Sequence, residues 1–138
     1  WAIYGFVLSY GHTGDGKYLE TAVRLAKKFV GELDNEMVPV WDFRLSPGEK
    51  PVRDASAAAV MVCGIQELAS HQAADGELLS VKQTLLSRLC GGEYLDANPD
   101  CRGVLKCGYG SKAAYSSWGD YFLMEALSRE LFDMENFW

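Results

Sequence analysis

Apolar residues recur along much of the chain at steps of three and four, the period of amphipathic helices. Residues 17–33 follow this pattern and predict one helix with a single buried stripe and a charged opposite side. Residues 77–89 repeat the pattern, and a further apolar stripe predicts a closing helix over residues 120–131. We therefore expect three helices that each bury one side.

Two other segments, residues 1–10 and 55–70, are apolar on nearly every side, which predicts helices that are buried all round. Asp54 precedes the second of them and is placed to cap its first turn. The first run has no starting methionine, no capping residue and no charge before it. This predicts a chain that begins partway through a buried helix of a longer protein.

The apolar run at residues 1–10 does not have the features of a membrane or export segment. A secretory signal would carry a basic region before the run and a small-residue cleavage site after it, and neither is present. A membrane-spanning helix needs about 20 apolar residues, so the run is too short. We expect a soluble chain without a membrane partner.

Long loops separate the predicted helical pairs, over residues 34–54 and 90–118. The chain order is therefore buried helix, amphipathic helix, loop, buried helix, amphipathic helix, loop, helix. Inner helices that are each paired with an outer helix build a ring of helical hairpins, whose loops form a mouth at one end. The sequence predicts an all-α fold, and five helices predict only part of such a ring.

Composition and charge narrow the function. The chain has 138 residues, 49% of them hydrophobic, which allows one domain with a core. A net charge of -6 without a basic stripe argues against a nucleic-acid partner. No cluster of residues has metal-ligand spacing, and no metal or organic cofactor is expected.

Four cysteines form an even set, which admits a disulfide framework. Cys63 lies in an apolar helix, and the other spacings match neither a CxxC pair nor a zinc site; these cysteines are Cys90, Cys101 and Cys107. Reduced thiols in a cytoplasmic protein are the favoured interpretation.

Six ordered motifs carry a resemblance to a known family. They are residues 1–6 (WAIYGF), 12–15 (HTGD), 18–22 (YLETA), 38–43 (VPVWDF), 53–59 (RDASAAA) and 118–127 (WGDYFLMEAL). In this order and spacing the chain resembles the C-terminal part of the unsaturated glucuronyl hydrolases, glycoside hydrolase family 88. The match is weakest over residues 71–104.

The resemblance implies that residues 1–138 are the C-terminal portion of an (α/α)6-barrel glycoside hydrolase domain. The family removes 4,5-unsaturated uronic acid from the non-reducing end of lyase-generated oligosaccharides, so an unsaturated uronyl oligosaccharide is the expected partner. An aspartate acts as general acid and base while the vinyl-ether double bond is hydrated. Both catalytic aspartates of the family lie upstream of the motif at Trp1, so we assign no catalytic residue in this chain and expect it to be inactive alone.

Trp1 matches a family tryptophan that forms a wall beside the unsaturated sugar ring, and an indole face suits the C–H groups of a sugar. Packing in a core is the alternative role. The resemblance also places substrate contacts in a late loop, where Tyr109, Ser111 and Lys112 lie between glycines and offer two hydroxyls and a charge for a carboxylate or sulfate. An ordinary solvated loop is the alternative there.

Other chemically active residues are interpreted structurally. We expect Asp54 to cap a helix, and Asp42 to shape the first long loop by pairing with Arg53. Trp41 and Phe43 are expected to close that loop onto the core. The two histidines, His12 and His71, lie in polar turns and are expected to be exposed.

Two further functions remain open on the sequence. One is a related hydrolase that acts on unsaturated rhamnogalacturonyl products, which the same architecture would serve. The other is a non-catalytic helical-hairpin interaction domain, which self-associates through exposed helix faces.

Overall fold

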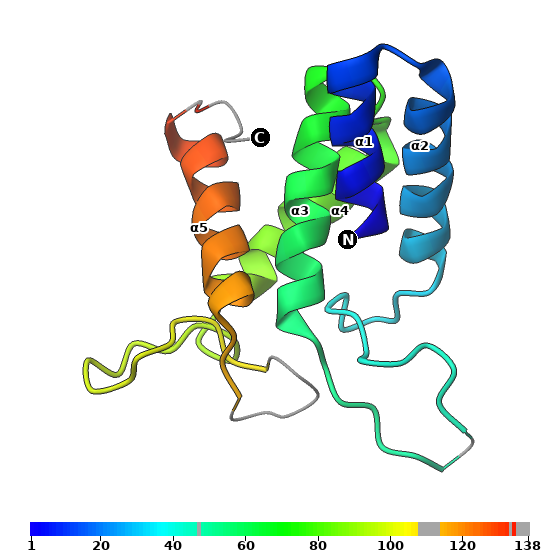
Figure 1. The fold of residues 1–138 in the computed structure, drawn as a ribbon. Coiled ribbons are helices and arrows are strands. Elements are labelled where there is room, and N and C mark those ends of the chain that lie inside the picture. Colours follow the sequence, from blue (N-terminus) through cyan, green and yellow to red (C-terminus); the bar gives the residue numbers. More distant parts are fainter. Residues whose placement is uncertain (47, 108–113, 133, 135–138) are drawn as a thin grey trace.

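The computed structural model describes residues 1–46, 48–107, 114–132 and 134, and within them the chain forms five helices and no strand. The helices are α1 (Ala2–Thr13), α2 (Gly16–Gly31), α3 (Ala55–Ser70), α4 (Gly76–Leu89) and α5 (Ser117–Phe132). Helix α3 lies between α1 and α5, while α2 packs on α1 and α4 packs on α3 (Figure 1). The helices thus form an inner row of α1, α3 and α5 backed by α2 and α4, as the pattern of apolar residues predicts.

Aspartates begin three of the helices. Asp15, Asp54 and Asp75 each accept a hydrogen bond from a backbone N–H of the first turn of α2, α3 and α4 respectively. Asp54 accepts two, from the N–H groups of Ser56 and Ala57. The capping role predicted for Asp54 is therefore confirmed.

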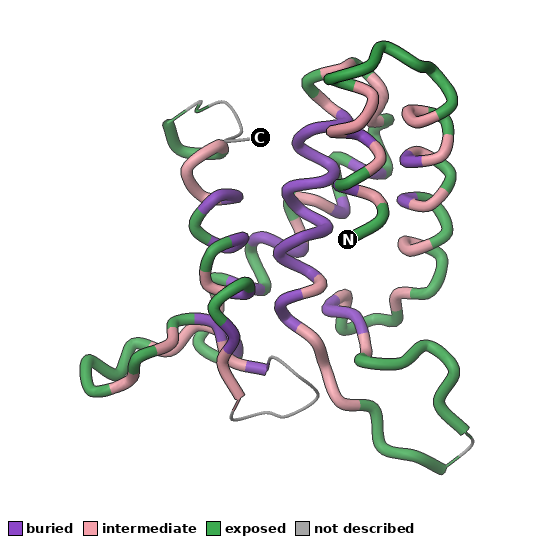
Figure 2. Tube along the Cα trace, viewed as in Figure 1, coloured by how far each residue is buried: buried purple, intermediate pink, exposed green. Residues whose placement is uncertain are grey.

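Helix α3 is the centre of the core (Figure 2). It is buried from Ala55 almost to its end, including the polar residues Gln66 and Glu67. Gly64 allows α1 to approach closely, because a Cβ at this position would lie 3.1 Å from Cγ2 of Ile3. The prediction of a helix buried all round is confirmed for residues 55–70.

The same prediction is wrong for residues 1–10. Only Tyr4 and Val7 of α1 are buried, and Trp1 is 71% exposed. The cause is that α1 packs on α2 and α3 and leaves its remaining sides open. The stripe predicted for residues 120–131 is also only partly correct, since Phe122 is buried but Met124 and Leu131 are exposed.

Residues 32–54 form a loop whose base is held by a partly buried cation, Arg53. The Arg53 guanidinium donates to both Asp34 carboxylate oxygens, at 3.0 and 2.8 Å, and to the carbonyl of Val38 at 2.9 Å. Asp42 instead accepts from the backbone N–H of Arg44. The predicted Asp42–Arg53 pair is therefore wrong, because Asp34 supplies the carboxylate.

The aromatic residues of this loop behave differently from one another. Phe43 makes an edge contact with Phe29 of α2 at 5.7 Å between ring centroids, so it closes the loop onto the helices as predicted. Trp41 is 52% exposed and does not join the core.

None of the four cysteines, all of them described, forms a disulfide, and Cys63 and Cys107 are buried. Across the described residues, no helix combines the length and the apolar character needed to cross a membrane.

Candidate functional site: an aromatic cavity between α1 and α5

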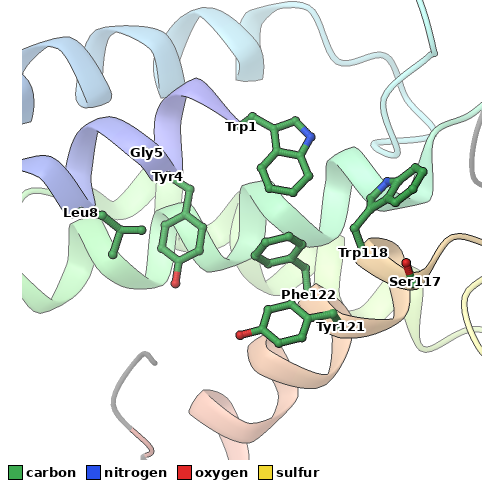
Figure 3. A pocket seen from close by; sticks show the side chains of 8 residues that line it. All are labelled: Trp1, Tyr4, Gly5, Leu8, Ser117, Trp118, Tyr121 and Phe122. Atoms are coloured by element: carbon green, nitrogen blue, oxygen red, sulfur yellow. The ribbon is translucent and has the colours of Figure 1, made fainter. Parts of the chain in front are cut away.

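An open cavity of about 600 Å³ lies between the start of α1 and the start of α5 (Figure 3). Five of its eight lining residues are aromatic. The lining consists of Trp1, Tyr4, Gly5, Leu8, Ser117, Trp118, Tyr121 and Phe122. The volume lies within the range of small-molecule sites, and an aromatic lining with a few hydroxyls is typical of them.

Trp1 forms the outer wall of the cavity on the α1 side. Its ring contacts Phe122 edge to face at a centroid distance of 5.0 Å. With 71% of its surface exposed, Trp1 does not have the core-packing role that was the alternative. An indole held on one side by a buried phenylalanine presents a flat apolar surface to the cavity.

Trp118 forms the wall on the α5 side. Its indole Nε1 donates to Oγ of Ser56 at 3.3 Å, and Ser56 donates in turn to Asp54 at 2.6 Å. The helix cap at Asp54 is thus linked through Ser56 to a cavity residue. Gly119 permits this arrangement, since a Cβ there would lie 2.8 Å from Oγ of Ser116 and 3.2 Å from Cβ of Ser56.

Two tyrosines provide hydroxyls at the floor of the cavity. Tyr4 donates its phenolic O–H to Oε1 of Glu125, and in Figure 3 the hydroxyls of Tyr4 and Tyr121 both point away from Trp1. Burial, the hydrogen bond to Glu125 and the charge of that carboxylate raise the pKa of Tyr4 far above its usual value. Tyr4 therefore remains a neutral phenol and a donor at every physiological pH.

A buried ionic chain continues behind the floor. Nη2 of Arg129 lies 2.8 Å from Oε2 of Glu67, and Nη1 lies 4.0 Å from Oε1 of Glu125. Oε1 of Glu67 lies 3.3 Å from Nε2 of His71, whose ring contacts Tyr10 edge to face at 5.0 Å. His71 is only partly exposed, so its expected exposure is wrong, whereas His12 is exposed.

Of the four site residues predicted from the sequence, one lies at the cavity and three lie outside the residues that the structure describes. Trp1 lies at the cavity, while Tyr109, Ser111 and Lys112 lie outside the described residues. The sequence interpretation missed Tyr4, Trp118 and Tyr121 as lining residues, although all three lie in the motifs at residues 1–6 and 118–127. Over the described parts of the chain, no group of three His, Cys, Asp or Glu side chains is suited to hold a metal ion.

The fold and the cavity together define a class: an all-α protein of paired helices with an aromatic small-molecule cavity on its inner row. Comparisons with known proteins are more specific. The unsaturated glucuronyl hydrolase of Bacillus sp. (strain GL1) is 31% identical over 148 residues, covering 100% of this chain and 39% of that protein. The unsaturated chondroitin disaccharide hydrolase of Streptococcus pneumoniae is 27% identical over 100% of this chain and 37% of its own length.

Solved structures agree with the sequence matches. The unsaturated glucuronyl hydrolase of Bacillus sp. GL1 superposes with a TM-score of 0.83 at 31% identity, over 95% of this chain and 37% of that one. A mutant of the Streptococcus agalactiae unsaturated glucuronyl hydrolase complexed with dGlcA-GalNAc6S superposes with a TM-score of 0.86 at 30% identity, over 100% of this chain and 39% of that one. No family model matches the chain.

The resemblance to the unsaturated glucuronyl hydrolases is therefore confirmed over the whole of this chain. The arrangement of helices is that of part of an (α/α)6 barrel. The chain spans about two fifths of the length of the curated relatives that it matches.

Proposed function

We propose that this chain supplies one wall of the sugar pocket of a glycoside hydrolase that removes 4,5-unsaturated uronic acid from lyase-generated oligosaccharides. One observation carries the proposal: Trp1 lies at the rim of an aromatic cavity, in a chain that aligns from end to end with unsaturated glucuronyl hydrolases. The domain would then be the C-terminal portion of an (α/α)6 barrel.

The chemistry of the described lining suits the apolar faces of a sugar ring. Trp1 and Trp118 offer indole faces for C–H groups, and Tyr4 and Tyr121 add phenol rings to this apolar surface. Among the described lining residues, no side chain is a cation for the uronyl carboxylate. We propose that the loop bearing Tyr109, Ser111 and Lys112 supplies it, with Lys112 facing a carboxylate or a sulfate.

The reaction itself is proposed to need residues beyond this chain. The family resemblance assigns vinyl-ether hydration to aspartates upstream of the motif at Trp1. The 138-residue chain should therefore leave the double bond of an unsaturated chondroitin disaccharide intact, as followed by its ultraviolet absorbance. Loss of that absorbance on adding the purified chain would contradict this.

Two further proposals concern the cellular location of the protein and its self-association. Four cysteines without a disulfide, two of them buried, support a reducing and hence cytoplasmic location. Self-association is supported by large apolar side chains exposed on α5, namely Met124, Leu131 and Phe132. Sedimentation velocity across a concentration series tests self-association, and a monomer at every concentration would exclude it.

The binding proposal is tested by titrating the chain with unsaturated chondroitin disaccharide and measuring heat. We expect Trp1→Ala to weaken binding about fivefold to tenfold, since a contact with an aromatic face is worth on the order of 1 kcal/mol. Trp41→Ala is the matched control, because Trp41 is an exposed tryptophan outside the cavity lining. Equal affinity of the wild type and Trp1→Ala would overturn the proposal.

A further inference from the structure

Glu125 is one of the most deeply buried charged residues described in the chain, and it lies directly behind the aromatic cavity. Its side chain is 1% exposed, and its carboxylate accepts the hydrogen bond of Tyr4 from the opposite helix. Arg129, one turn further along α5, lies 4.0 Å away and binds Glu67 of α3 at 2.8 Å. One network of polar side chains thereby joins the three inner helices α1, α3 and α5.

A network of buried charged side chains is an unfavourable way to hold helices together. Two carboxylates and a guanidinium lose their hydration on burial, and apolar residues of similar volume often stabilise a core equally well. Arg129 and Glu67 are 9% and 8% exposed, so solvent does little to offset this cost. Buried ionic groups that are retained despite their cost can serve to fix one geometry.

The geometry fixed here is that of the cavity. Tyr4 belongs to the α1 wall, and Glu125 lies one turn of α5 beyond Tyr121 and three residues beyond Phe122, both of which belong to the α5 wall. Tyr4 also contacts the Phe122 ring edge to face at 6.1 Å. The hydrogen bond between Tyr4 and Glu125 therefore ties the two walls together immediately below the space between them.

We propose that Glu125 is the positioning residue of the aromatic cavity: its carboxylate, in the field of the nearby Arg129 guanidinium, fixes the Tyr4 hydroxyl and so sets the separation of the α1 and α5 walls that hold the sugar ring. That a sugar ring is the ligand rests on the proposed function. The effect of Glu125 on the separation of the two walls does not depend on it. Glu125 itself does not line the cavity, so it acts through Tyr4.

Two minimal variants and their combination test this role. Tyr4→Phe removes only the hydroxyl, and Glu125→Gln keeps the size and an acceptor oxygen but removes the charge. We expect Tyr4→Phe to weaken binding of unsaturated chondroitin disaccharide by about tenfold, the effect of losing a hydrogen bond to a charged group. Glu125→Gln should weaken binding by less, about twofold to fivefold, because its amide oxygen can still accept from Tyr4. The double variant should bind no more weakly than Tyr4→Phe alone, because without the hydroxyl the charge at position 125 no longer acts on the α1 wall.

Glu130→Gln is the matched control. It changes a carboxylate of the same helix that pairs with Lys82 at 2.6 Å and is not part of the cavity lining. Its affinity for the disaccharide should stay within about twofold of the wild type. Wild-type affinity in Tyr4→Phe, or fully additive losses in the double variant, would overturn the proposal.

A ligand-free measurement separates this proposal from the proposed function. The ¹H–¹⁵N indole signal of Trp1 reports the α1 wall and should move in Tyr4→Phe and in Glu125→Gln but not in Glu130→Gln. If the wild type does not bind the disaccharide, the proposed function fails, and these indole shifts still decide the positioning role. If Glu125→Gln does not fold, Tyr4→Phe decides it, and an unmoved Trp1 signal in that variant would overturn it.

Discussion

Trp118 donates its indole N–H to Oγ of Ser56, which links the wall of the cavity to the first turn of the most buried helix. Ser56 is itself 6% exposed and donates to the Asp54 carboxylate that caps α3. The orientation of a cavity residue on α5 therefore depends on the capping geometry of α3. This link connects the stability of the core to the shape of the site.

Replacing Ser56 should affect stability and the cavity together. Ser56→Ala removes the hydrogen bonds that join the Ser56 hydroxyl to Trp118 and to Asp54, and we expect the free energy of unfolding to fall by about 1–3 kcal/mol. Urea denaturation followed by circular dichroism measures the loss. Ser70→Ala, at the exposed end of the same helix, is the control and should cost less. Equal losses in the two variants would show that the two hydrogen bonds of Ser56 contribute no more than the single backbone hydrogen bond of Ser70.

Substituting two glycines, Gly5 of α1 and Gly64 of α3, should change the stability of the fold in opposite directions. A Cβ at Gly64 would lie 3.1 Å from Ile3 and 3.5 Å from the backbone nitrogen of Tyr4, so Gly64→Val should push α1 away and cost about 1–3 kcal/mol. A Cβ at Gly5 meets no atom within 4 Å, so Gly5→Ala should raise stability by up to about 1 kcal/mol through helix propensity.

Thermal unfolding of the two glycine variants provides the measurement. A lower midpoint for Gly64→Val with an unchanged or higher midpoint for Gly5→Ala is expected. An unchanged midpoint in Gly64→Val would mean that α1 and α3 do not pack as closely as the structure shows.

The ion pair at the base of the first long loop predicts a dependence of stability on pH. The hydrogen bonds that Arg53 donates to Asp34 hold the pKa of Asp34 below its usual value of about 4. A carboxyl whose pKa is lower in the folded state stabilises the fold above its unfolded pKa and loses this contribution as the pH falls through the folded value. The contribution should therefore be complete at neutral pH and decline below about pH 4.

Asp34→Asn isolates that contribution. The difference in unfolding free energy between wild type and Asp34→Asn should be constant from neutral pH to about pH 5 and should shrink at lower pH. The effect should be small, because half of the Asp34 side chain is exposed. A difference that grows as the pH falls would contradict the predicted sign.

The helices could be predicted from the sequence because the spacing of their apolar residues is a property of each local segment. The Asp54 cap and the apolar run after it fix where α3 begins, and the structure agrees at Ala55. The exposure of Trp1 could not be predicted from the sequence, because it depends on which helices cover α1 and not on the sequence of α1 itself. The partner of Arg53 depends likewise on the path of the whole loop, which brings Asp34 nearer than Asp42.

The site was only partly predictable for a similar reason. Trp1 was selected through family resemblance, whereas Tyr4 and Trp118 came together only once α1 and α5 were placed on either side of α3. Glu67 gave one signal in the sequence, as the one charged residue of the apolar helix α3. A charge in such a position needs a buried partner, and Arg129 is that partner at 2.8 Å.

A sugar held in the cavity between α1 and α5 should change the surroundings of the two indoles that form its walls. This change is measured from the indole ¹H–¹⁵N signals of ¹⁵N-labelled chain as unsaturated chondroitin disaccharide is added. We expect the signals of Trp1 and Trp118 to shift together and saturably while that of Trp41 stays in place. Unmoved Trp1 and Trp118 signals at a saturating concentration of the disaccharide, or a shift confined to Trp41, would show that the sugar does not occupy this cavity.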